Sequence, residues 1–144
     1  MAKTALILTT TASQIDCSQM SAITGLAIVS TEPANTTTKY AFKTAAGVWR
    51  RWNTTTPAWE NLPTQAITAS SLLTEGNTKA ELLAITAANL QWLAGSKNDA
   101  AVALSMTDTA TEPPSLTSIT ANGTTGSTVY EKVITSDSID LSTV

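Results

Sequence analysis

The chain has 144 residues, a formal net charge of −3 and a pI near 4.7, and only 13% of its residues are charged. Small hydroxyl side chains take the place of charge, with 28 threonines and 14 serines. A chain of this length can bury about two-thirds of the surface that its unfolded form exposes, so we expect one domain with its own core. The absence of histidine excludes the commonest general base and metal ligand, and the single cysteine excludes an internal disulfide.

The sequence also argues against several classes of partner. The eight basic residues are scattered, with Arg50-Arg51 as the one adjacent pair, so we expect no nucleic-acid partner. No apolar stretch approaches the roughly 20 residues that span a bilayer, so we expect no membrane insertion. The apolar run at residues 5–8 is too short for a secretion signal, which indicates synthesis in a reducing cytoplasm.

The many threonines favour β-strands, because β-branched side chains fit a half-exposed pleated surface. Residues 5–10 are predicted to form a first strand, and residues 11–16 a turn or loop. The apolar segment at residues 25–30 predicts a short strand in the middle of a sheet, and residues 32–35 end it with turn-forming residues.

A three-stranded meander is predicted next, with strands at residues 39–44, 48–52 and 58–62. Alternation in the first strand places Tyr40 and Phe42 on one face, and Gly47 allows the positive φ of a tight turn. In the second strand, a strict period of two places Trp49 and Trp52 on opposite faces, unless a bulge intervenes.

The hydrophobic period then changes to that of a helix. Thr78 followed three positions later by Glu81 fits a capping box ahead of an apolar run. Thr86 can start a second short helix, and Gly95 is a natural stop. Trp92, near the end of this segment, is expected to dock where the helix covers a sheet face.

Three more strands are predicted, at residues 100–106, 115–121 and 127–134. Alternation in the middle one of these strands places Leu116 on one face and Ile119 on the other. The dipeptide Asn122-Gly123 predicts a turn before the last strand.

Together these elements predict a mainly-β fold, an antiparallel β-sandwich-like domain with one short helical segment near residues 78–94. Residues 1–24 are expected to form an N-terminal strand or arm, and residues 25–134 the β-rich domain with its helical insertion. Residues 135–144 are polar and are expected to form a C-terminal arm.

No catalytic, cofactor or metal motif is found, so we expect that the protein is not an enzyme and needs no cofactor. The acidic residues form no recognisable pair, and Asp137 and Asp140 lack the spacing of an EF-hand. A serine nucleophile needs histidine or lysine in a defined geometry, and nothing in the sequence nominates such a pair.

The meander carries the candidate binding residues. Aromatic faces stack on sugar rings and anchor protein interfaces, and arginine and tryptophan are both enriched at interface centres. The candidates are Tyr40, Trp49, Arg50, Arg51, Trp52 and Trp59, with Phe42 as a further aromatic. The alternative is that the aromatic residues form ordinary core.

Four segments of this region resemble small modules of tailed-bacteriophage virion proteins, such as those of tail fibres and baseplates. The segments are Lys39-Tyr40-Ala41-Phe42-Lys43, Val48-Trp49, Pro57-Ala58-Trp59 and Gly76-Asn77-Thr78-Lys79-Ala80-Glu81-Leu82. The resemblance covers roughly residues 22–130, and Ala46-Gly47 stands where an Asp-Gly turn is expected. It carries over no catalytic residue.

The resemblance implies a structural component of the virion: a fibre, baseplate or head-decoration protein that is made in the host cytoplasm. Such a protein would act by self-assembly as a homo-oligomer, with a trimer favoured, and by docking on other virion proteins. The alternative is a carbohydrate-binding module that recognises a host surface glycan through exposed tryptophans.

Overall fold

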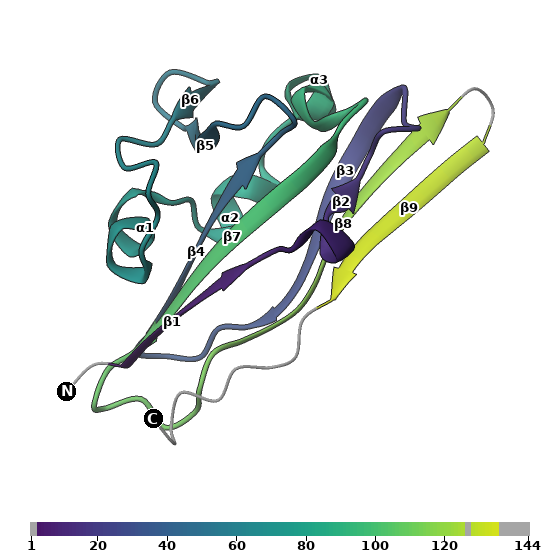
Figure 1. Cartoon of the computed structure of the whole chain (residues 1–144). Coiled ribbons are helices and arrows are strands. Elements are labelled where there is room, and N and C mark those ends of the chain that lie inside the picture. The colour runs from purple at the N-terminus through teal and green to yellow at the C-terminus, as the bar shows by residue number, and fades with distance from the viewer. Residues whose placement is uncertain (1–2, 126–127, 136–144) are drawn as a thin grey trace.

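The computed structural model describes residues 3–125 and 128–135 and consists of two antiparallel sheets that face each other (Figure 1). The larger sheet has the order β1-β7-β4-β5-β6, with β2 pairing along β7, and the smaller sheet has the order β3-β8-β9. The strands are β1 (Lys3–Leu8), β2 (Ile15–Asp16), β3 (Ala22–Thr31), β4 (Thr36–Lys43), β5 (Trp49–Asn53), β6 (Ala58–Asn61), β7 (Lys97–Met106), β8 (Ser115–Thr125) and β9 (Thr128–Thr135). The predicted mainly-β, sandwich-like antiparallel fold is therefore confirmed.

The helical region is longer than predicted and divided. It consists of α1 (Ala69–Glu75), α2 (Lys79–Leu83), α3 (Ala87–Leu90) and the 3₁₀ turn η2 (Gln91–Leu93), while η1 (Thr11–Ser13) lies near the N-terminus. The capping box of Thr78 and Glu81 starts α2 as predicted, and Thr86 is the N-cap of α3. The prediction of one segment near residues 78–94 missed α1, because its N-cap Thr68 pairs with Ser71 rather than with glutamate or glutamine.

The predicted meander is confirmed. Strands β4 and β5 form a hairpin whose turn contains Gly47 at φ +81°, and β6 pairs with β5. Trp52 belongs to the core between the sheets, whereas Trp49 packs against a second cluster on the α1 side of the larger sheet. The two tryptophans therefore lie on opposite faces, as the strand period predicts.

Strand β3 is an edge strand and not the central strand that its apolar sequence predicted. Among the described residues it pairs with β8 alone, and Val29 on it is 54% exposed. An apolar run is ambiguous here, because β3 buries Ile23 and Ile28 in the core between the sheets and exposes others such as Val29.

The turn predicted at Asn122-Gly123 is also wrong, because β8 continues through both residues. Gly123 lies opposite Ile23 in the register of β3 and β8. A Cβ atom added at Gly123 would lie 2.3 Å from the carbonyl oxygen of Ala22. This glycine is therefore used for close approach of two strands and not for a turn.

A register shift explains why Leu116 and Ile119 share a face, although the sequence predicts that they lie on opposite faces. Val29 pairs with Ser118 and Ser30 with Leu116, which leaves Thr117 as an extra residue on β8. This bulge brings Leu116 and Ile119 to the same face, and both are buried in the core between the sheets. The strict alternation that separated them in the sequence does not survive the bulge.

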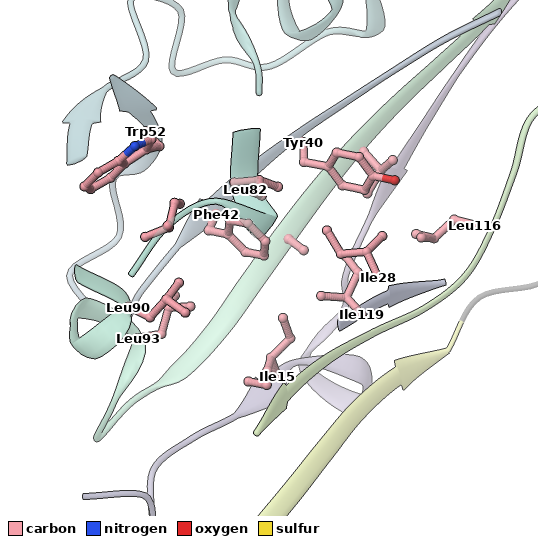
Figure 2. Close-up of a cluster of buried hydrophobic side chains, with 14 of the residues drawn as sticks. Ile15, Ile28, Tyr40, Phe42, Trp52, Leu82, Leu90, Leu93, Leu116 and Ile119 are labelled. Atoms are coloured by element: carbon pink, nitrogen blue, oxygen red, sulfur yellow. The ribbon is translucent and has the colours of Figure 1, made fainter. Parts of the chain in front are cut away.

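The main core fills the space between the two sheets and is drawn in Figure 2. It combines Tyr40 and Phe42 of the larger sheet with Ile28 and Ile119 of the smaller sheet, and helix α2 adds Leu82. A smaller cluster lies between the larger sheet and α1, with Ala41, Leu62, Leu72, Ala101 and Ala103. Strands β4 and β7 are thus buried on both faces.

The structure describes the expected N-terminal strand or arm but almost none of the expected C-terminal arm. Strand β1 pairs with β7 from Lys3 to Leu8 and forms one edge of the larger sheet. Of the expected C-terminal arm at residues 135–144, only Thr135 is described, as the last residue of β9, and the rest lies outside the described residues.

Asn77, in the link between α1 and α2, joins two strands that separate from each other. Strands β4 and β5 pair only at Phe42–Arg50 and Lys43–Trp49. Beyond these pairs, the backbone of Asn77 bonds to Tyr40 in both directions, at 2.8 and 2.9 Å. Its side chain accepts from the Trp52 amide at 2.7 Å and donates to the Trp52 carbonyl at 2.8 Å. One residue therefore fills the place of a missing strand.

We predict that N77A lowers the free energy of unfolding by about 2–4 kcal/mol, because it leaves a buried amide and a buried carbonyl of Trp52 without partners. Urea unfolding monitored by tryptophan fluorescence measures this loss. The control is N61A, at an exposed position on β6, where a change within about 0.5 kcal/mol is expected. Equal effects of the two substitutions would contradict the joining role of Asn77.

Candidate functional site

Tyr40 lies in the core and not on a binding surface. Its side chain is fully buried, and its hydroxyl donates to the Glu32 carboxylate at 3.1 Å. Ser30 donates to the same carboxylate oxygen at 2.6 Å. Burial raises the pKa of Tyr40 well above its usual value, so the phenol stays protonated. The structure thus gives Tyr40 a packing role between the two sheets.

Trp59 is the centre of a group of four aromatic rings. Its ring centroid lies 6.4 Å from that of Phe42, 5.5 Å from that of Trp52 and 4.5 Å from that of Trp92. Its indole N–H donates to the carbonyl of Asn89 at 2.8 Å. These contacts tie β6 to α3 and η2, and they occupy the ring with partners from the same chain.

Trp49 lies on the other face of β5, away from this group. The ammonium of Lys43 lies 5.0 Å from its ring centroid, and the half-buried side chain packs against the smaller cluster that contains Leu62 and Leu72. The side-chain amide of Gln65 accepts from the Trp49 amide at 2.8 Å and donates to the Trp49 carbonyl at 2.9 Å.

The adjacent arginines point to opposite faces and do not form one basic patch. The guanidinium of Arg50 lies 5.5 Å from the ring centroid of Trp92. Arg51 instead pairs with Glu60, with its Nε 2.8 Å from Oε1, and donates to the carbonyl of Glu75 at 3.0 Å. The six candidates from the sequence are therefore spread over the core, the aromatic group and the α1 side of β5.

An open groove lies beside Arg51, between the β5–β6 hairpin and the link from α1 to α2. Its volume is about 370 Å³. It is lined by Lys39, Arg51, Trp52, Asn53, Thr54, Glu60, Thr74, Glu75, Gly76, Asn77, Thr78 and Glu81. Only Arg51 and Trp52 were candidates from the sequence. The capping box had singled out Glu81 as a helix residue, but no signal in the sequence placed it at a groove.

Two of the carboxylates in this groove are held in the ionised form. The hydrogen bond from Arg51, and then that from Asn53, lowers the pKa of Glu60 below its usual value of 4.5. The backbone N–H of Thr78 is the largest cause that lowers the pKa of Glu81, and Asn77 and Lys39 add to it. The groove therefore presents fixed negative charge beside two cations at neutral pH.

Within residues 3–125 and 128–135, no three acidic or cysteine side chains lie close enough together to hold a metal ion. None of the described helices is long and apolar enough to cross a membrane. Comparison of the chain with family models, with curated proteins and with solved structures gave no match in any of the three.

We predict that R51Q raises the pKa of Glu60 toward 4.5, because the largest cause of its lowered value is the hydrogen bond from Arg51. The Glu60–Arg51 pair should stabilise the fold fully above pH 4.5 and should lose this effect as the pH falls through the folded-state pKa of Glu60. NMR titration of the side-chain carboxyls measures the pKa of Glu60 and that of Glu81. Glu81 is the internal control, since its pKa is set by Thr78, Asn77 and Lys39. An unchanged Glu60 pKa in R51Q would contradict the assignment.

Proposed function

We propose that this chain is a structural component of a tailed-bacteriophage virion, a fibre, baseplate or head-decoration protein that acts by self-assembly and docking. The observation that carries the proposal is the outer edge of β1. The resemblance of the meander and the α2 start to virion modules supplies the setting, and the edge supplies a physical means of assembly.

Strand β1 offers the backbone of a strand that can take another partner. All six of its residues pair with β7 on one side, and no strand of the described residues pairs with its other side. Ala5 and Ile7 pack against the core between the sheets, Leu6 packs against the α1 side, and Leu8 is 49% exposed. An edge of this kind templates the addition of a further strand, and Lys3 is the only charge that could oppose it.

Two of the other described edges, those of β6 and β3, are shorter or covered, whereas β9, with eight residues, forms the second edge of the smaller sheet. Strand β6 has four residues, and one of them is the charged Glu60. Strand β3 is covered by α2 and α3, and the side-chain amide of Gln91 bonds to both the N–H and the C=O of Ile23, at 3.2 and 2.9 Å. Compared with β6 and β3, β1 is therefore the edge that suits pairing with a second copy.

The alternative function, a carbohydrate-binding module, requires tryptophan rings that are exposed to a sugar. Trp52 is 8% exposed, and the ring of Trp59 contacts three other aromatic rings. Aromatic rings with internal partners offer less free face for a sugar, so these contacts favour the assembly proposal over recognition by these rings.

We predict that the purified chain forms a symmetric oligomer and that L8K weakens its association by about tenfold or more, because a lysine on an edge strand opposes strand addition. Light scattering coupled to size-exclusion chromatography measures the mass. The matched control is V29K, which replaces a valine of similar exposure on β3 and should keep the oligomer. A monomeric native chain, or equal effects of L8K and V29K, would refute assembly through β1.

A separate experiment tests whether the chain is part of a virion. Gold-labelled antibody against the chain should mark one defined position on phage particles released from the bacterium that carries the gene, as seen by electron microscopy. Excess purified chain should abolish the labelling. Particles that carry no label would exclude a role as a virion component, whatever the oligomeric state of the purified protein.

A further inference from the structure

The groove beside Arg51 has the size of a ligand site and a polar lining. Its volume of about 370 Å³ lies within the roughly 300–1,000 Å³ that is typical of small-molecule sites. Trp52 is the only large apolar residue among the described residues that line it. A ligand must therefore exchange hydrogen bonds with water for hydrogen bonds with the groove, which favours a polar molecule over an apolar one.

Glu81 contributes an acceptor whose position is fixed. Its Oε1 atom accepts from the backbone N–H of Thr78 at 2.9 Å and from the side chain of Asn77 at 3.3 Å. The Thr78 side chain also interacts with this carboxylate, as the smallest cause of its lowered pKa, but no described residue makes a hydrogen bond of ordinary geometry to Oε2, and the residue lines the groove. The carboxylate is thus oriented by the helix cap and keeps one oxygen for a ligand.

Lys39 contributes a donor next to this acceptor. It lies on β4, and a Cβ atom added at Gly76 would be 3.0 Å from its own Cβ, so the strand and the link pack closely here. Among the described residues its ammonium makes no hydrogen bond or ion pair, yet it lies near enough to Glu81 to lower that pKa. The groove therefore has a cationic donor and an anionic acceptor among the residues that line it.

The charge of the groove selects against strongly ionic ligands. Three carboxylates, those of Glu60, Glu75 and Glu81, oppose an anion, while Arg51 and Lys39 oppose a cation. Neighbouring hydroxyls of a neutral sugar can each donate to a carboxylate and accept from an ammonium or guanidinium. A neutral polyhydroxylated ring thus satisfies both kinds of group at once.

We propose that this groove binds a neutral pyranose unit of an oligosaccharide, with Lys39 Nζ donating to one hydroxyl and Glu81 Oε2 accepting from a neighbouring one. Arg51 and Glu60 line the site and orient each other. The site lies on the α1–α2 link and not on the faces of Trp59 and Trp92. It does not rest on the assembly role, because strand β1 contributes no residue to it.

Two substitutions test the open pair without removing the cap. E81Q keeps an oxygen for the capping box, which accepts glutamine as well as glutamate, and replaces the open acceptor with a donor. K39M keeps most of the side-chain volume and removes the ammonium. The matched controls are K79M, on the same helix as Glu81 but bonded to Ser30, and E112Q on the exposed link between β7 and β8.

The labelled chain is applied to an array of neutral and acidic oligosaccharides, and the ligand that binds is titrated by isothermal calorimetry. We expect a neutral glycan to bind, with affinity reduced about tenfold or more in K39M and in E81Q and unchanged in both controls. Amide shifts in NMR spectra should centre on Gly76, Asn77 and Thr78.

Three outcomes would overturn the proposal. They are no binding of any neutral glycan, binding of acidic glycans alone, and affinity that is unchanged in K39M and E81Q. Thermal unfolding of each variant checks the fold, and K39M decides the matter should E81Q unfold. The L8K experiment measures assembly and not glycan affinity, so failure of the assembly proposal is distinguishable from failure of the glycan proposal.

Discussion

The double pairing of Asn77 is the contact on which the larger sheet depends. Strands β4 and β5 share only two residue pairs before they diverge, and the gap would leave backbone groups of Tyr40 and Trp52 buried without partners. Asn77 supplies partners for both residues: its backbone bonds to Tyr40 on β4, and its side chain bonds to Trp52 on β5. The same residue fixes the link between α1 and α2, and with it Gly76 and Thr78. The groove is lined by this link, whose position between the two strands Asn77 fixes.

Side-chain amides serve as substitute strands at two further places in this fold. Gln65 bonds to both the N–H and the C=O of Trp49, and Gln91 does the same for Ile23 on the edge of β3. An amide side chain can do this because it carries a donor and an acceptor at the spacing of a peptide group. Strand β1 receives no such cover from the described residues, and its last residue, Leu8, stays half-exposed. A chain that closes one edge in this way and leaves another open favours assembly through the open one.

Local signals in the sequence predicted the local structure well. The Gly47 hairpin, the opposite faces of Trp49 and Trp52 and the capping box at Thr78 each depend on a few neighbouring residues, and all are confirmed. Apart from the missed start of α1, the failures concern pairing between distant segments. Asn122-Gly123 is typical of a turn, and only the close approach of β3 to Gly123 explains why the glycine lies inside β8. Leu116 shares a face with Ile119 only because Thr117 is an extra residue opposite β3. No periodicity within one segment contains that information.

The candidate site shows the same division between local and distant information. Aromatic residues draw attention in a sequence, but here Trp59 binds its own neighbours, whereas the open groups at the groove are Lys39 and Glu81, which lie 42 positions apart and have no common motif. The topology also relates the two proposals. Strand β1 is one edge of the larger sheet, and the β5–β6 hairpin that borders the groove is at the other end of it, with β7 and β4 between them. Addition of a strand at β1 therefore extends the sheet away from the groove and leaves it open, so one chain can be built into an assembly and still present a binding site on its far side.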